Sequence, residues 1–310
     1  MKLKNKKVLV TGGAGFIGSH LVDELLKHDN KVVIVDNLTQ RCGRNAEYAN
    51  GKRLKILDIT TKRFMKYMLE NSFEYIFHLA SCSYVPASVK DPYYDCEVNI
   101  KGTLNLLESL RRGNKKVKLV FMSSGAVYGE PDKLPISELT PPNPISPYGV
   151  SKLSAENYCF AYNKLYGLNI VIARNFSTYG PRQKKQLVYD MLKKMDTKNA
   201  NIKLFGTGKE TRDLIYVKDV VCALIILAER GDENCGIYNI ATGKAYHLKA
   251  ITRLIANGYG QDVKIKFIGK LRKGDPMHWD VNINKIKKLG FRPSYTLEKG
   301  IAETVNWFKK

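Results

Sequence analysis

The sequence predicts an α/β protein built on a doubly wound parallel sheet, with a smaller α/β domain toward the C-terminus. The first half of the 310-residue chain alternates short apolar runs with helical patterns, which is typical of strand–helix–strand units with right-handed crossovers. A glycine-rich turn joins the first of these strands to the first helix. From about residue 181 the alternation gives way to segments with more turn residues and charges, which indicates a second, smaller unit.

The expected elements follow in chain order. Strands are expected at 8–11, 32–35, 54–57, 75–80, 118–122 and 170–173. A first helix is expected after the glycine turn, running on through Leu21, Val22, Leu25 and Leu26, and further helices at about 60–71, 99–112 and 148–166. A strand at 214–217, a helix at 220–227 and a strand at 238–240 indicate that the chain returns to the first domain. We therefore expect one domain at 1–180 with a return at 214–243, and a second at 181–213 and 244–310. The cleft between the two domains is the expected substrate site.

The composition limits the classes of partner. The formal net charge of +22 is compatible with a nucleic acid, an anionic lipid or an anionic substrate. The lysines are dispersed in short pieces such as 184–185, 193–194 and 287–288, with no block of five or more. A dispersed lysine surface is typical of solvation, so nucleic-acid binding is the less favoured interpretation.

The apolar runs and the cysteines of the sequence indicate the cellular compartment. No apolar run approaches the roughly 20 residues of a membrane span, and the N-terminal apolar run is too short for a signal peptide. We therefore expect a cytoplasmic protein. The six cysteines are scattered without a C-x-x-C pair, which predicts neither a disulfide framework nor a metal site; they are Cys42, Cys82, Cys96, Cys159, Cys222 and Cys235.

The glycine turn indicates a dinucleotide site. Gly12, Gly15 and Gly18 follow the first strand and open the first helix, where a pyrophosphate can approach the backbone. The spacing differs from the common G-x-G-x-x-G, so the context carries the prediction. Asp36 ends the second strand, 18 residues after Gly18, and an acid there suits a ribose 2′-hydroxyl and favours NAD over NADP. The alternative is a turn in an unrelated α/β protein with a solvated aspartate.

Three side chains suggest hydride-transfer chemistry. Ser124 ends a strand, and Tyr148 and Lys152 are four residues apart, so they share one face of a helix. A lysine cation and the positive nicotinamide would lower the tyrosine pKa from its usual value near 10. Tyr148 could then take a hydroxyl proton while carbon loses hydride to NAD⁺, with Ser124 bonded to the same oxygen. The alternative is a packing tyrosine beside a solvated lysine.

These motifs resemble those of the extended short-chain dehydrogenase/reductases, in their nucleotide-sugar epimerase/dehydratase group. The resemblance covers nearly the whole chain and implies a Rossmann-type fold. The matching stretches are TGGAGFIG (11–18), Asp36-Asn37-Leu38, Asp58-Ile59, FHLAS (77–81), VNIKGT (98–103), SSGAVYG (123–129), SPYGVSK (146–152), STYGPRQ (177–183), GTGKETRDLIYVKDV (206–220), YNIATG (238–243), Arg272-Lys273-Gly274-Asp275 and LGFRP (289–293).

The resemblance implies a role for each matching position. Along the NAD cofactor these are Gly12, Gly15, Phe16, Ile17 and Gly18 at the pyrophosphate, Asp36 and Asn37 at the adenosine ribose, Asp58 and Ile59 at the adenine, and Leu79, Ala80 and Ser81 beyond them. Tyr148 would be the base, Lys152 would also bind the nicotinamide ribose, and Ser124 would complete the triad. Arg212 and Arg272 would grip the diphosphate of a nucleotide sugar, with Phe205 near its base and Ser177 where the family usually has a phosphate-binding asparagine.

The positions after Ser124 bear on the reaction. Family dehydratases and decarboxylases usually carry an acid there, whereas this chain has Gly125 and Ala126. The resemblance is thus closest to the UDP-glucose 4-epimerases, which implies oxidation at C4 to a ketone with transient NADH, rotation of the ketosugar and hydride return to the other face. The alternatives are a 4,6-dehydratase or decarboxylase, a deoxysugar reductase, and a noncatalytic or RNA-binding member.

The substrate and the assembly are less defined. Ser177 and the loop at 184–187 depart from the family pattern, so a UDP-sugar is favoured while GDP, CDP or dTDP sugars and N-acetylated or uronic sugars stay open. The family also suggests a homodimer through helices near 100–112 and 150–166.

Overall fold

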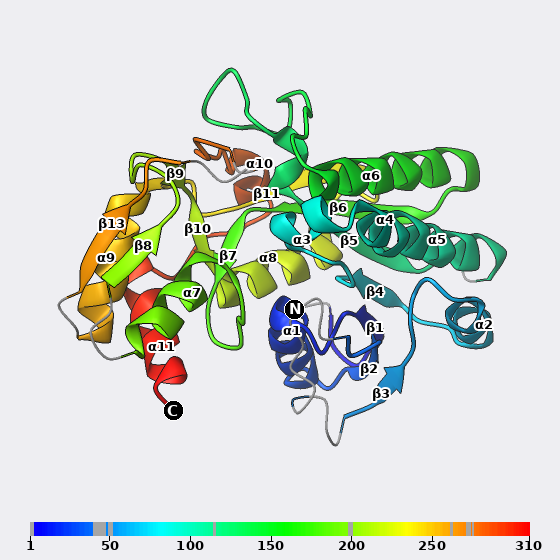
Figure 1. The fold of residues 1–310 in the computed structure, drawn as a ribbon. Coiled ribbons are helices and arrows are strands. Elements are labelled where there is room, and N and C mark those ends of the chain that lie inside the picture. The colour runs from blue at the N-terminus through cyan, green and yellow to red at the C-terminus, as the bar shows by residue number, and fades with distance from the viewer. Residues whose placement is uncertain are drawn as a thin grey trace.

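A single parallel sheet organises the larger part of the protein (Figure 1). The computed structural model describes residues 3–39, 48, 52–113, 116–197, 201–260, 263–270, 274 and 276–310. Its seven-stranded sheet has the order β11–β6–β5–β4–β1–β2–β3, and all its strand pairs are parallel. The strands are β1 (Lys7–Thr11), β2 (Lys31–Asp36), β3 (Leu54–Ile56), β4 (Tyr75–His78), β5 (Lys118–Ser124), β6 (Asn169–Asn175) and β11 (Asn234–Ile240). The predicted doubly wound α/β fold is confirmed.

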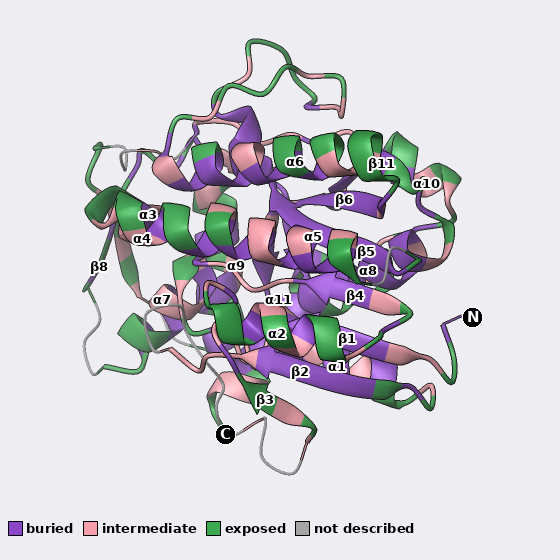
Figure 2. Cartoon of the chain, turned by 90° about the vertical axis from the view of Figure 1, so that its right-hand side faces the viewer, coloured by how far each residue is buried: buried purple, intermediate pink, exposed green. Residues whose placement is uncertain are grey.

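Helices cover both faces of this sheet (Figure 2). One face packs against α1 (Phe16–Leu26) and α8 (Val217–Arg230), and the other against α2 (Lys62–Glu70), α5 (Gly102–Arg112) and α6 (Pro147–Tyr166). Because neighbouring strand residues point to opposite faces, Val8 and Val10 enter the first apolar cluster and Leu9 the second. Burial of both faces of the sheet explains why the sequences of these strands are unbroken apolar runs.

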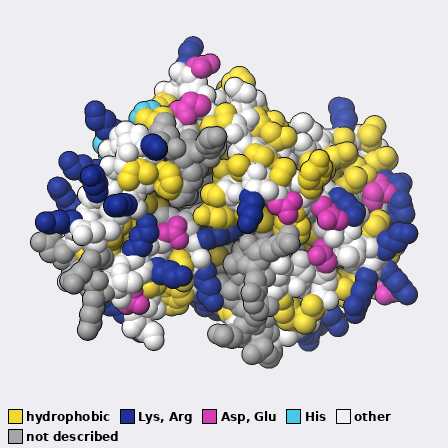
Figure 3. Space-filling model, viewed as in Figure 1, with side chains coloured by type: hydrophobic (Ala, Val, Ile, Leu, Met, Phe, Trp, Pro, Cys, Tyr) yellow, Lys and Arg dark blue, Asp and Glu magenta, His cyan; other side chains and the backbone are white. Residues whose placement is uncertain are grey.

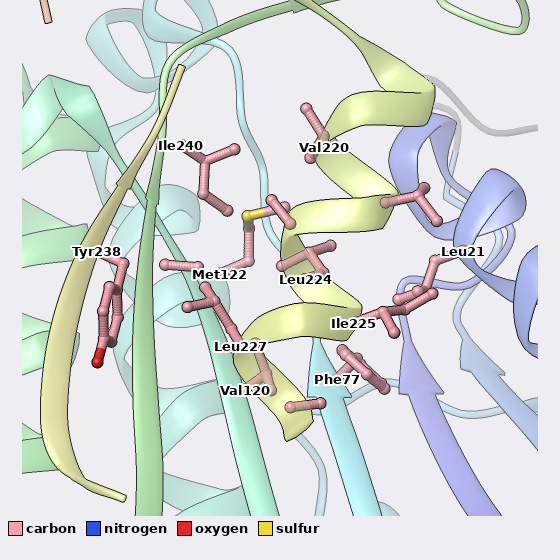
Figure 4. Close-up of a cluster of buried hydrophobic side chains, with 14 of the residues drawn as sticks. Leu21, Phe77, Val120, Met122, Val220, Leu224, Ile225, Leu227, Tyr238 and Ile240 are labelled. Atoms are coloured by element: carbon pink, nitrogen blue, oxygen red, sulfur yellow. The ribbon is translucent and has the colours of Figure 1, made fainter. Parts of the chain in front are cut away.

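The first cluster shows how α8 returns to the sheet (Figure 4). Leu224 and Leu227 of α8 lie against Val120 and Met122 of β5. Tyr238 and Ile240 of β11 extend the same cluster along the sheet.

Short helices precede α5, where the sequence predicts one helix from residue 99. They are α3 (Val85–Lys90), α4 (Pro92–Cys96) and a π-helical turn (Glu97–Lys101) that runs directly into α5. A 3₁₀ turn (Gly125–Tyr128) likewise follows β5. These pieces lie near the carboxyl ends of β4 and β5.

A smaller unit with its own apolar cluster lies on the left of Figure 1. It contains β7 (Ser177–Tyr179), α7 (Gln186–Met195), β8 (Asn201–Leu204), β9 (Thr211–Arg212), β10 (Leu214–Tyr216), β12 (Tyr246–His247), α9 (Leu248–Tyr259), β13 (Lys264–Phe267) and α11 (Leu297–Phe308). The strands form three two-stranded sheets, β10–β7, β12–β9 and β13–β8. Thus β10 lies outside the seven-stranded sheet, and α10 (Asn284–Lys288) packs beside β11. The predicted domain boundaries stay a prediction.

The surface agrees with a dispersed charge. Lys and Arg side chains are spread over the face in Figure 3, with Asp and Glu side chains among them. Within the described ranges, no helix is both long and apolar enough to cross a membrane.

Asp213 ties β10 to the loop after β11, and this contact predicts a stability effect. The buried carboxylate accepts hydrogen bonds from the backbone N–H groups of Thr242, Gly243 and Lys244 and from the Thr242 hydroxyl. Asp213→Ala leaves these donors without their acceptor, so we expect a loss of about 3 kcal/mol. Differential scanning calorimetry should show a melting temperature lower by roughly 5 °C or more.

The matched control is Glu70→Ala, which removes an exposed carboxylate whose nearest ion-pair contact is 3.8 Å. We expect that variant to melt within about 1 °C of the parent, since exposed pairs contribute little. Equal melting of the parent and Asp213→Ala would contradict the role given to Asp213.

Candidate active site

A cavity of about 490 Å³ opens at the carboxyl ends of the parallel strands and continues over the smaller unit. Most of the predicted site residues line it. They are Gly12, Gly15, Phe16, Ile17, Gly18, Asp36, Asn37, Asp58, Ile59, Leu79, Ala80, Ser81, Ser124, Tyr148, Ser177, Phe205 and Arg212. Lys152 is buried behind the wall, on the same helix as Tyr148. Arg272 lies outside the described residues.

The glycine turn forms one end of the cavity. Gly12 has a φ of +70°, and a Cβ atom there would lie 2.7 Å from the backbone nitrogen of Ala80. A Cβ atom on Gly18 would overlap the carbonyl oxygen of Gly12. Helix α1 begins directly after the turn, and its N-cap Gly15 provides no side-chain cap for the first N–H groups. The uncapped N–H groups at the N-terminus of α1, directly after a glycine turn, can bind a pyrophosphate.

Two acids follow the turn at the ends of the neighbouring strands. The Asp36 carboxylate accepts hydrogen bonds from the backbone N–H groups of Ala14 (3.1 Å) and Leu38 (2.9 Å). Burial raises the pKa of this carboxyl above its ordinary value, against the effect of these hydrogen bonds. The Asn37 amide donates to the Asp58 carboxylate at 2.8 Å. Asp36, Asn37 and Asp58 therefore fit an adenosine ribose at this end.

The predicted serine and tyrosine meet in the middle of the cavity. Helix α6 begins at Pro147 after an N-cap, Ser146, whose side chain accepts the N–H of Gly149. This start places Tyr148 in the first turn, where the Ser124 and Ser81 side chains act to lower the pKa of its hydroxyl. Ser124 is itself held by the backbone N–H of Ala126, which donates to its hydroxyl oxygen at 3.1 Å.

Lys152 lies one helical turn further along α6. Its ammonium group is 4.3 Å from the centre of the Phe121 ring, a cation–π contact with β5. Burial lowers the pKa of Lys152 to about 8, although nearby Cys159, Glu156 and Asp95 act in the opposite direction. Burial likewise raises the pKa of Tyr148 to about 12. In the protein alone, desolvation outweighs the groups that lower the Tyr148 pKa. The lowered tyrosine pKa that the sequence predicts includes the charge of a bound nicotinamide and stays a prediction.

A buried hydrogen-bond network supports this centre from below. The Ser81 hydroxyl donates to the Asn99 side-chain oxygen at 2.7 Å, and the Asn99 amide donates to Asp95 (3.1 Å) and Ser151 (3.0 Å). The Ser151 hydroxyl donates to the other oxygen of Asp95 at 2.5 Å. Sequence reasoning gave no role to Asn99 or Asp95. Their polar side chains on the buried face of a helical segment were the available signal.

Cationic side chains line the part of the cavity in the smaller unit. The Arg212 guanidinium donates to the carbonyl oxygens of Thr211 (2.8 Å) and Met277 (3.1 Å) and lies 5.6 Å from the Trp279 ring centre. Lys184 and Lys185 also line the wall, with Lys194 and Lys203 further along it. These positively charged side chains can bind anionic groups such as phosphates. Phe205 is 51% exposed there and offers a ring face.

Several further lining residues were missed at the sequence level. Asn175 ends β6, and Ser83–Pro86 follow β4, so the carboxyl-end rule could have found both. Trp279 comes from a loop that pairs with the smaller unit far along the chain, and no local pattern marks it. Within the part of the chain that the structure describes, no cluster of three His, Cys, Asp or Glu side chains could hold a metal ion.

Known proteins provide an independent comparison. Residues 8–241 match the model of the NAD dependent epimerase/dehydratase family. The chain is 39% identical to a putative UDP-glucose 4-epimerase of Methanocaldococcus jannaschii, over 97% of this chain and 98% of that protein.

Solved structures agree with this. A UDP-N-acetylglucosamine 4-epimerase from Methanobrevibacter ruminantium M1, in complex with UDP-N-acetylmuramic acid, superposes with a TM-score of 0.90 at 33% identity and covers 99% of both chains. The UDP-glucose 4-epimerase of Thermus thermophilus in complex with NAD also gives 0.90 at 33% identity, over 98% of this chain and 99% of that one. With a family model matched over most of its length and full-length relatives above 30% identity, the chain belongs to the NAD dependent epimerase/dehydratase family.

Proposed function

We propose that the protein is an NAD-dependent nucleotide-sugar epimerase that inverts C4 of a UDP-hexose. One observation carries the proposal: Ser124 and Tyr148 both line a cavity that starts at the glycine turn and ends among cationic side chains, and Ser124 acts to lower the Tyr148 pKa. The related proteins named above as 4-epimerases of UDP-sugars support the same reaction.

The cofactor would lie along the carboxyl ends of β1, β2 and β4. The turn at Gly12–Gly18 would hold its pyrophosphate, Asp36 its adenosine ribose, and Asp58 and Ile59 its adenine. Leu79, Ala80 and Ser81 would line its path toward Tyr148, and Lys152 would bind the nicotinamide ribose. When bound, NAD supplies the hydride acceptor and donor for C4 of the sugar.

The side chains of the protein accept and return the proton of the C4 hydroxyl. Tyr148 accepts the proton of the C4 hydroxyl as hydride leaves the same carbon, and Ser124 donates a hydrogen bond to that oxygen. Lys152 stabilises the tyrosinate from one helical turn away. After the 4-ketosugar has rotated in the site, hydride returns to the opposite face of C4, and Tyr148 returns its proton to the C4 oxygen. The reaction is then balanced, with no net oxidation.

The wall beside Ser124 favours epimerisation over dehydration. A Cβ atom on Gly125 would lie 2.7 Å from the Phe176 ring, so an acidic side chain has no room there in this arrangement. Four acids line the cavity within the described residues, and Asp36 and Asp58 stand at its cofactor end. Of the other two, Glu210 is engaged by the N–H groups of Thr207 and Gly208. Asp190 belongs to α7 in the smaller unit.

The substrate end suits a nucleoside diphosphate. Arg212, Lys184 and Lys185 provide positive charge for the two phosphates, and Phe205 provides a surface for the base. The family resemblance and the UDP-sugar epimerases among the relatives favour uridine over other bases.

A second copy of the chain is the proposed partner. Helix α6 exposes large apolar side chains along its outer side, namely Val150, Tyr158, Phe160, Leu165 and Tyr166. A second α6 would cover such a surface, in line with the homodimer that the sequence suggests.

The reaction can be tested with the purified protein. We expect bound NAD(H) in the ultraviolet absorbance of the acid-released cofactor. Incubation with UDP-glucose, UDP-N-acetylglucosamine and UDP-glucuronate, followed by proton NMR, should show exchange between equatorial and axial C4 protons for at least one substrate. NADH should not accumulate. A 4-keto-6-deoxy product would instead indicate a dehydratase.

The assigned base can be tested with Tyr148→Phe. Removing the hydroxyl deletes the proton acceptor, so kcat should fall by roughly 10² to 10⁴. The ring remains to pack in the buried site, so cofactor content should stay at the parental level. Near-parental turnover would refute the assignment of Tyr148 as the base.

A further inference from the structure

A buried ion pair lies behind the Ser124–Tyr148 pair and has no part in the steps described so far. Arg174 of β6 donates to both oxygens of Glu156 of α6, at 3.0 Å from Nε and 2.6 Å from Nη2. Their side chains are only 3% and 0% exposed. Such a bidentate pair has a defined geometry, because the guanidinium fork matches the carboxylate.

The same pair holds the end of β5. The Ser123 hydroxyl donates to Glu156 Oε1, and Ser123 directly precedes Ser124 in the strand. The Arg174 guanidinium also lies 4.7 Å from the centre of the Tyr128 ring, in the 3₁₀ turn that follows Ser124. The backbone on both sides of Ser124 is therefore in contact with one ion pair.

The position of Glu156 on α6 links this contact to the reaction. Tyr148, Lys152 and Glu156 are spaced four residues apart, so all three lie on the helix face toward the sheet. A shift of α6 relative to β5 would change the Glu156–Ser123 contact and the Tyr148–Ser124 contact together. Glu156 is also one helical turn beyond the buried Lys152, and its charge acts to raise the pKa of the Lys152 ammonium.

We propose that Glu156, held by Arg174 and Ser123, is a positioning residue that fixes α6 against β5 and supplies a negative charge facing Lys152. The proposal rests on the proposed function, since it assigns Glu156 a role in the geometry of the Ser124–Tyr148–Lys152 set. Without the Glu156–Ser123 contact, α6 loses one of its links to β5, and without the carboxylate, the ammonium loses one of the negative charges that act to raise its pKa.

The charge surroundings determine the expected pH effect. Titratable groups that face Glu156 are Lys152 and Cys159 of α6, Arg174 of β6, Tyr128 after β5 and Cys235 of β11. Lys152 also faces Asp95 of α4 and His78 of β4. Of these, burial keeps His78 neutral, with its pKa lowered to about 3. Loss of the Glu156 charge lowers the pKa of Lys152, so the ammonium would lose its proton at a lower pH.

Ser123→Ala tests the positioning contact alone. It removes one hydroxyl and leaves the ion pair and the triad residues in place, so the fold should persist. We expect kcat to fall about tenfold, since a charge-assisted contact is lost, with KM and bound cofactor unchanged. The matched control is Ser109→Ala in α5, which removes an equally buried hydroxyl bonded to the Asn105 carbonyl, far from the cavity. It should keep parental kcat.

Glu156→Gln tests the charge. We expect the alkaline limb of the kcat–pH profile to move to lower pH by about half a unit or more. A purely structural role would lower the rate equally at every pH. The control is Glu303→Gln, which removes a carboxylate bonded to Lys218 and Tyr216 in the smaller unit and should leave the profile in place. Glu156→Asp, which restores the charge, should return the alkaline limb to the parental position.

The outcomes separate this proposal from the function on which it rests. If Tyr148→Phe abolishes turnover while Ser123→Ala and Glu156→Gln keep the parental kcat and pH profile, the positioning role is wrong and the epimerase assignment stands. If Tyr148→Phe keeps parental turnover, the proposed function itself fails.

Discussion

The reversal of strand order between β1 and β4 is the constraint on which the rest of the molecule depends. Crossovers from the two halves of a doubly wound sheet leave on opposite faces, so no helix closes the carboxyl edge at this point. Because all seven strands run in the same direction, the residues that follow them meet there. The glycine turn follows β1, Asp36 ends β2, Ser81 follows β4, Ser124 ends β5 and Asn175 ends β6. The cavity is the direct consequence of this topology.

The larger part of the fold could be predicted because its strands are buried on both faces. Val8–Val10 and Ile170–Ala173 are continuous apolar runs whose alternate residues enter different clusters, and such runs stand out in a sequence. The smaller unit offered weaker signals. β8 pairs with β13 although residues 201–204 and 264–267 are far apart in the chain, and both strands alternate polar with apolar residues. No local pattern specifies that pairing.

The residues of the candidate site likewise fall into those that the sequence could predict and those that it could not. Residues next to a strand end, such as Ser124 and Asp36, could be found from sequence, whereas Trp279 reaches the cavity only through tertiary contacts. The electrostatics could not be anticipated either. Neighbouring charges alone suggest a lowered tyrosine pKa, but burial of Tyr148 and Lys152 acts on both groups and disfavours their charged forms. In the protein alone, burial therefore favours the neutral phenol of Tyr148.

The late position of β11 in the chain has a consequence for biosynthesis. A nascent chain that has emerged only as far as Asn175 contains six of the seven parallel strands, yet it lacks both β11 and α8. The hydrogen-bonding edge of β6 and the apolar face that α8 covers in Figure 4 are then open to solvent. Such a partial sheet is prone to pair with other chains until residue 240 has been released and β11 covers the edge of β6.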